Sequence, residues 1–87
     1  GNPLVHQIPD GEGIVHSHIN TSRSGYFVAN FDLDNNVTLA PEGGGSFDIT
    51  IPPGCKVHIS DKIAMKATGA NSTRNYVFLM WNAGEAA

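Results

Sequence analysis

The sequence predicts an all-β fold, a small antiparallel β-sandwich or jelly-roll-like barrel of about seven short strands. Apolar and polar residues alternate with a period of two in several short segments, and residues that favour turns separate these segments. No window of ten or more residues shows an apolar stripe at helical spacing. Several short strands at close spacing are typical of a sandwich or barrel.

Seven segments have the pattern of a strand. In chain order they cover residues 15–19, 25–33, 37–39, 46–51, 56–59, 62–67 and 75–81. Because side chains alternate between the two faces of a strand, most of these segments should bury one face only. The apolar faces are expected to hold Phe27, Ala29, Phe31 and Leu33; Val37 and Leu39; Phe47, Ile49 and Ile51; Val57 and Ile59; and Ile63, Met65 and Ala67.

The segments between the predicted strands have the composition of turns. Asp34–Asn36 tolerates left-handed backbone, Pro41–Gly45 is rich in glycine, and Pro53-Gly54 suits the two central positions of a type II turn. With 87 residues the chain fits a single domain. We expect an extended N-terminal arm at 1–12, which is polar and interrupted by Pro and Gly, a sandwich at 13–83 and a short tail at 84–87.

Composition argues against two classes of partner. The formal charge of −3 and the five scattered Lys and Arg residues leave no basic stripe for nucleic acid. The longest apolar stretch, Tyr76–Trp81, is too short to span a membrane. The single cysteine, Cys55, excludes an internal disulfide, which favours a virion or cytoplasmic location, and a secreted location stays open.

The strand predicted at 75–81 is apolar on both faces. Val77, Leu79 and Trp81 form one face, and Tyr76, Phe78 and Met80 form the other. Either the strand lies between two layers of the protein, or one face docks onto another subunit, as the aromatic and Met content of interface cores suggests. The predicted interface residues are Tyr76, Phe78, Met80 and Trp81, with Pro3, Leu4 and Val5 of the arm.

Three histidines are candidate metal ligands. His16 and His18 lie two positions apart on a predicted strand, so their imidazoles share a face about 6.5–7 Å apart along the chain. His58 is a possible third ligand, and neutral imidazoles suit zinc, copper, nickel or iron. The alternative is a pair of solvent-facing histidines that bind nothing. No other cofactor is expected.

Parts of the sequence resemble the two motifs of the cupin family: Gly11, His16, His18, Ile51–Gly54 and His58. The resemblance implies a metal-binding small β-barrel that uses the three histidines. The glutamate that the family places soon after H-x-H is absent, since Asn20–Ser24 occupies that stretch. The same H-x-H resembles the iron-binding motif at the trimeric tips of contractile phage tail spikes.

No residue pattern predicts an enzyme. Cys55 and His58 are three apart, so on a strand they would lie on opposite faces, and Cys55 is expected to be a small buried residue beside Val57 and Ile59. There is no G-x-S-x-G turn and no phosphate-binding loop.

In overall style the chain resembles the small β-sandwich decoration or cement proteins of phage capsids. That resemblance implies a non-enzymatic structural role, in which the arm at 1–12 reaches across subunits of a capsid shell. It also implies a homo-oligomer, with a trimer favoured. A third possibility is a carbohydrate- or cell-surface-binding tip domain, in which Tyr26 and Trp81 would be exposed stacking platforms.

Overall fold

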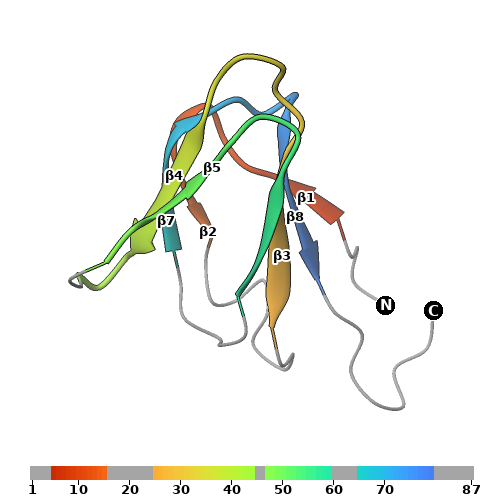
Figure 1. The fold of residues 1–87 in the computed structure, drawn as a ribbon. Helices are drawn as coiled ribbons and strands as arrows, with labels where there is room; N and C mark the ends of the chain where they lie inside the picture. The colour runs from red at the N-terminus through yellow and green to blue at the C-terminus, as the bar shows by residue number, and fades with distance from the viewer. Residues whose placement is uncertain (1–4, 16–24, 45–46, 60–64, 80–87) are drawn as a thin grey trace, which may run out of the picture.

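The computed structural model describes residues 5–15, 25–44, 47–59 and 65–79, with the backbone alone for 12–15. These residues form eight strands and no helix (Figure 1). The strands are β1 (Val5–Gln7), β2 (Gly11–Val15), β3 (Tyr26–Asn30), β4 (Val37–Pro41), β5 (Ile49–Ile51), β6 (Lys56–Ile59), β7 (Met65–Ala70) and β8 (Asn75–Leu79).

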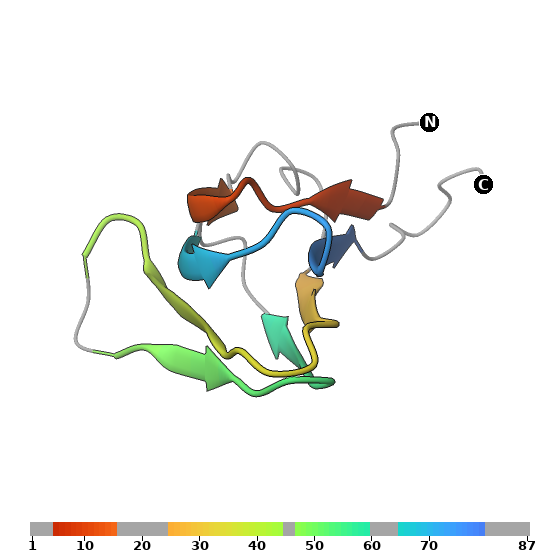
Figure 2. The ribbon, with the colours of Figure 1, turned by 90° about the horizontal axis from the view of Figure 1, so that it is seen from above.

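The described strands form two four-stranded sheets. The first sheet has the order β1-β8-β3-β6 and the second has the order β2-β7-β4-β5, with every pairing antiparallel. Figure 2 shows the sheets as two layers, in which β1 and β8 of the first sheet lie across from β2 and β7 of the second. This strand order is that of an eight-stranded jelly roll. The predicted all-β sandwich is therefore confirmed.

The core lies between the two sheets and is formed by alternate residues of their strands. In β4, Val37 and Leu39 are buried while Thr38 is partly exposed, and in β7 Met65 and Ala67 are buried while Lys66 is exposed. The largest apolar side chains that are fully buried in the core are Tyr26, Ile8, Leu39, Ile51, Met65, Val28, Val37 and Val77. In β4 and β7, the residues that the predicted period-two alternation places on one face are thus the residues that contact the core.

Two glycines have left-handed backbone that shapes the strands. Gly54 has a φ of +75°, and the Cys55 amide donates to the carbonyl of Pro52 at 3.2 Å, which confirms the predicted turn at Pro53-Gly54. Gly69 has a φ of +78° inside β7. The register against β2 shifts there, because Gly11 is paired with Ala70 and Glu12 with Thr68, so Gly69 is the extra residue of a β-bulge.

The prediction for β3 was wrong about its face. The core side of β3 is formed by Tyr26 and Val28, not by the face that holds Phe27. Phe31 lies past the end of the strand and is 51% exposed, and Leu33 in the following loop is 79% exposed. Residues 26–29 are all apolar or aromatic, so alternation could not distinguish the two faces.

The predicted N-terminal arm is built into the sandwich over its described part. Residues 5–7 form β1 on the edge of the first sheet, and β2 begins at Gly11 in the second. Between these strands Ile8 is 1% exposed and belongs to the core, and its amide donates to the carbonyl of Asn75 at 3.0 Å. Residues 1–4 and the predicted tail at 84–87 lie outside the described residues.

Candidate docking face

The outer side of the first sheet carries an unusual set of side chains for a solvent-facing surface. Directly opposite residues of antiparallel strands lie on the same face. The register pairs Phe78 with Val5 and with Phe27, and it pairs Phe27 with His58. We call the outward-facing set the aromatic face: Val5, Phe27, Phe31, His58, Tyr76 and Phe78.

The rings of the aromatic face contact one another at edge-to-face or tilted angles. Phe31 lies 5.8 Å from Tyr76 and 6.3 Å from Phe78, measured between ring centroids, with interplanar angles of 63° and 77°. The rings of Phe27 and His58 are 4.8 Å apart. Such contacts hold rings in defined orientations, so they form a structured surface on the outside of the core.

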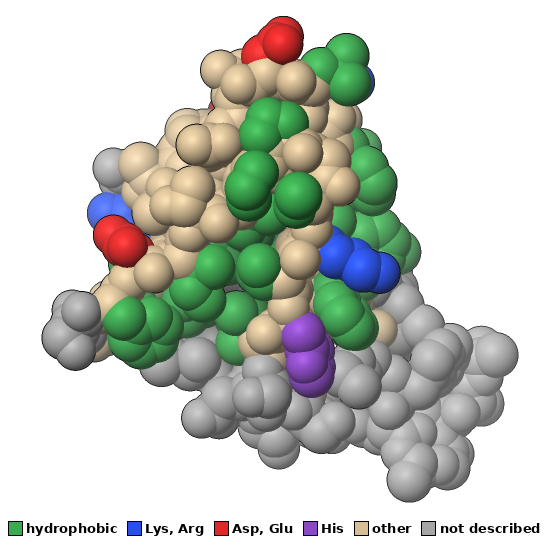
Figure 3. Space-filling view, viewed as in Figure 1, with side chains coloured by type: hydrophobic (Ala, Val, Ile, Leu, Met, Phe, Trp, Pro, Cys, Tyr) green, Lys and Arg blue, Asp and Glu red, His purple; other side chains and the backbone are tan. Residues whose placement is uncertain are grey.

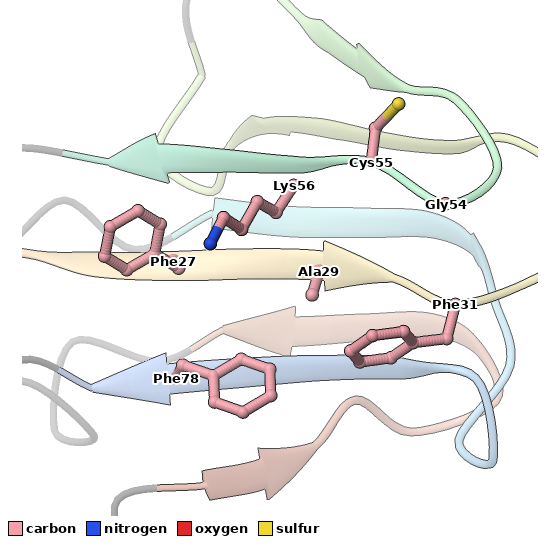
Figure 4. A pocket seen from close by; sticks show the side chains of 7 residues that line it. All are labelled: Phe27, Ala29, Phe31, Gly54, Cys55, Lys56 and Phe78. Carbon is pink, nitrogen blue, oxygen red and sulfur yellow. The ribbon is translucent and has the colours of Figure 1, made fainter.

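A groove of about 400 Å³ is set into this face. It is lined by Phe27, Ala29, Phe31, Gly54, Cys55, Lys56 and Phe78, and Figure 4 shows these side chains across the strands of the first sheet. The volume is within the range of sites that hold a small ligand or a large side chain. Lys56 is the charged residue among the described residues that line it.

The groove follows from the order of side-chain sizes along β3. Phe27, Ala29 and Phe31 share the outer face, so the small Ala29 leaves a recess between two large rings. Across the recess, the ammonium nitrogen of Lys56 lies 5.2 Å from the centre of the Phe27 ring, a cation–π contact. Figure 3 shows a basic side chain (blue) lying beside hydrophobic side chains (green) on this side of the molecule.

The end of the groove at Gly54 and Cys55 is fixed to the end of β3 by two hydrogen bonds. The amide of Gly54 donates to the carbonyl of Asn30, and the amide of Asn30 donates to the carbonyl of Cys55, both at 2.8 Å. The turn before β6 is therefore held in place against β3. The groove thus has a rigid wall formed by main chain.

The structure brings together three of the predicted interface residues. Val5 is 48% exposed at the edge strand, and Tyr76 and Phe78 are partly exposed beside it on β8. The opposite face of β8 is buried, with Val77 at 1% and Leu79 at 7% exposure. The predicted residues Pro3, Leu4, Met80 and Trp81 lie outside the described residues.

The candidate metal ligands are only partly described. His58 is exposed on the outer face, where its ring packs against Phe27. His16 and His18 lie outside the described residues, so their convergence with His58 stays a prediction. Within the described ranges, no group of three or more His, Cys, Asp or Glu side chains is placed to hold a metal ion.

Two predictions about single residues were wrong. Cys55 is exposed and lines the groove, because it belongs to the turn before β6 and not to the buried side of that strand. Tyr26 is 1% exposed in the core, so it cannot be an exposed platform for sugars. Its partner in that hypothesis, Trp81, lies outside the described residues.

Of the residues that line the groove, the sequence predicts only Phe78 as a site residue and misses six: Phe27, Ala29, Phe31, Gly54, Cys55 and Lys56. The sequence signal is the large-small-large spacing of Phe27, Ala29 and Phe31, which alternation alone places in the core. Only the pairing of β3 with β8, whose core side is Val77 and Leu79, shows that this spacing faces outward.

Comparison of the chain with protein family models, with curated proteins and with solved structures finds no match. Across the described ranges, no helix is long and apolar enough to cross a membrane. The aromatic face and its groove are therefore the features of the described structure that point to a function.

Proposed function

We propose that the chain is a non-enzymatic assembly module that binds other protein subunits, including copies of itself, through the aromatic face. The observation that carries this proposal is the ring cluster of Phe31, Tyr76 and Phe78 outside the core. Ring clusters of this kind usually form inside proteins, where their apolar surface is removed from water. Here Phe31 keeps 51% of its surface exposed.

The composition of this surface suits a protein partner. Interface cores are enriched in aromatic side chains, and contiguous exposed apolar patches mark interaction sites. The rings already contact one another, so little side-chain entropy is lost when a partner covers them. Val5 on the edge strand extends the same surface beyond the groove.

The specific role that we propose is that of a decoration or cement protein on a virion shell, with a trimer as the favoured form. The jelly-roll arrangement is compatible with this role, but capsid proteins, lectins and cupins all use it, so the fold does not choose among them. The choice depends on whether the aromatic face binds protein.

Solution mass tests the proposal. Multi-angle light scattering of the wild-type chain should give a multiple of 9.2 kDa, with three chains favoured. Phe31→Asp and Val5→Asp should each shift the mass toward one chain, because each places a charge in the covered surface. Leu33→Asp is the matched control: Leu33 is 79% exposed outside the aromatic face, so its variant should keep the native mass.

A wild-type chain that stays monomeric at all accessible concentrations would contradict self-assembly. So would face variants that fold, as judged by circular dichroism, and keep the native mass. A monomer whose ring resonances shift on addition of oligosaccharide in NMR titrations would instead favour the carbohydrate-binding alternative.

A further inference from the structure

We propose that the groove receives Phe47 of a second copy of the chain, with Asp48 of that copy facing Lys56. This inference rests on the proposed function, because it names the contact through which copies would associate. Phe47 is 53% exposed and Asp48 is exposed, immediately before β5 of the second sheet. The chain therefore exposes an aromatic residue followed by an acidic one, and it also carries a groove lined by aromatic rings and Lys56.

The groove and the Phe47 ring are complementary in chemistry. Three phenylalanine rings line the groove, and a further ring entering it could pack against them at the edge-to-face angles that aromatic pairs favour. Ala29 forms the floor and leaves the space of about 400 Å³ unfilled. Burial of an exposed ring in such a space removes apolar surface of both copies from water.

The charges are complementary as well. Lys56 lines the groove, while the whole chain has a formal charge of −3, so an arriving copy is on average repelled by the rest of the surface. Asp48 follows the inserted ring in the chain, and the long side chain of Lys56 would have to reach past the ring to pair with its carboxylate. This pairing would fix the orientation of the ring more than it adds affinity.

Phe47 fits the groove better than the other exposed apolar candidate, Leu33. Within the described residues the large exposed hydrophobics are Val5, Phe31, Leu33 and Phe47, of which Val5 and Phe31 belong to the aromatic face itself. Leu33 is aliphatic, and the preceding Asp32 already accepts hydrogen bonds from the amides of Asp34 and Asn35. Among the described residues, none donates a hydrogen bond to the carboxylate of Asp48.

The ring and the groove lie on different parts of the molecule, so the contact joins two different surfaces. The chain just before β5 lies away from β3 and β8 in both views (Figures 1 and 2). Contacts of this head-to-tail kind form a closed ring when the rotation closes, as in a trimer, and a filament when it does not. One ring buries about 150–250 Å² of the roughly 800 Å² that a stable interface needs per partner, so the rest of the aromatic face must contribute.

Sedimentation velocity over a range of concentrations tests the contact. Phe47→Ser should raise the dissociation constant at least about tenfold, because a central aromatic anchor is lost while its exposed position spares the fold. Asp48→Lys and Lys56→Asp should each weaken association. The double variant should restore it at least in part, since the two charges are exchanged.

A mixing experiment tests the head-to-tail geometry. Phe47→Ser lacks the ring but keeps the groove, whereas Ala29→Leu fills the groove but keeps the ring. Each variant alone should be monomeric, and an equimolar mixture should approach twice 9.2 kDa, because one intact ring meets one intact groove. The charge-exchange series replaces Ala29→Leu if that variant does not fold.

If Phe31→Asp dissociates the assembly while the Phe47 and Asp48 variants keep the native mass, the inference is overturned and the proposed function stands. If the wild type is monomeric, both this inference and the proposed self-assembly are contradicted.

Discussion

The side-chain amide of Asn75 donates a hydrogen bond to the side-chain oxygen of Asn30 at 2.8 Å, although the two residues are 45 positions apart. Both side chains are buried, at 2% and 1% exposure. Asn30 also donates to the carbonyls of Asn35 and Ile51, and its oxygen accepts from the amide of Asp32. A satisfied polar network therefore joins β3, β8 and the end of β5 inside an otherwise apolar core.

Asn30→Ala should lower the free energy of unfolding by about 3 kcal/mol or more, because it leaves several buried polar groups without partners. Urea unfolding measures the change. Asn35→Ala is the control, since its exposed side chain makes one long contact of 3.3 Å with Asp32, and it should cost less than about 1 kcal/mol. A loss at Asn30 no larger than at Asn35 would show that the network does not stabilise the fold.

Leu39→Ala should destabilise the protein by about 2–5 kcal/mol, because Leu39 is fully buried between the sheets. Leu33→Ala removes the same atoms from a position that is 79% exposed, and its effect should stay within about 0.5 kcal/mol. The two denaturation midpoints measure the difference. Equal effects would contradict the assignment of the core.

Gly69→Ala should cost about 1–2 kcal/mol, because a side chain is disfavoured at the φ of +78° that the bulge requires. The added Cβ would lie 3.6 Å from the carbonyl oxygen of Asn36, an ordinary contact, so the backbone conformation accounts for the loss. Gly43→Ala, in open space without positive φ, should change little. Thermal unfolding of the two variants provides the comparison.

Asp10 should make stability depend on acid pH. Its carboxylate accepts a hydrogen bond from the amide of Ser72 at 2.7 Å, which lowers the pKa of Asp10. A lowered folded-state pKa gives stability that is present above the unfolded pKa of about 4 and is lost as the pH falls through the folded value. Asp10→Asn should therefore be less stable than wild type at pH 7, and the difference should shrink near pH 3.

Urea midpoints at the two pH values check this prediction. Ser72→Ala keeps the backbone amide, which is the main cause of the lowered pKa, so it should retain most of the pH dependence of wild type. If Asp10→Asn and wild type differ equally at both pH values, the carboxylate does not couple to folding.

The sequence predicted the fold class well because most strands bury only one face. In β4, for example, Val37 and Leu39 alternate with Thr38, and the turn at Pro53-Gly54 has residues that fit one backbone conformation. Strand β1 was missed, because its three residues are too few to show a period. Its position depends on pairing with β8, which lies near the other end of the chain.

The part of the site on β8 was predicted because that strand is apolar on both faces, and Val5 was predicted separately as part of the arm. That signal identified Tyr76 and Phe78, but it could not say which rings on other strands lie beside them. Phe31 joins them because the antiparallel register of β3 and β8 brings the end of β3 to the start of β8. Such contacts depend on tertiary pairing, which local alternation does not contain.

The jelly-roll strand order also limits how early the protein can acquire its structure. Among the described strands, the local hairpin is that of β4 and β5, whereas Val5 of β1 is paired with Phe78 of β8, more than 70 positions away. Closing so long a loop has an entropic cost before its contacts form, so folding is expected to be slow. On a ribosome, β1 and β3 would wait for β8, the strand between them, to emerge. Until then Phe27 and His58, on β3 and β6, lack the neighbouring rings of Tyr76 and Phe78, and the aromatic face is incomplete.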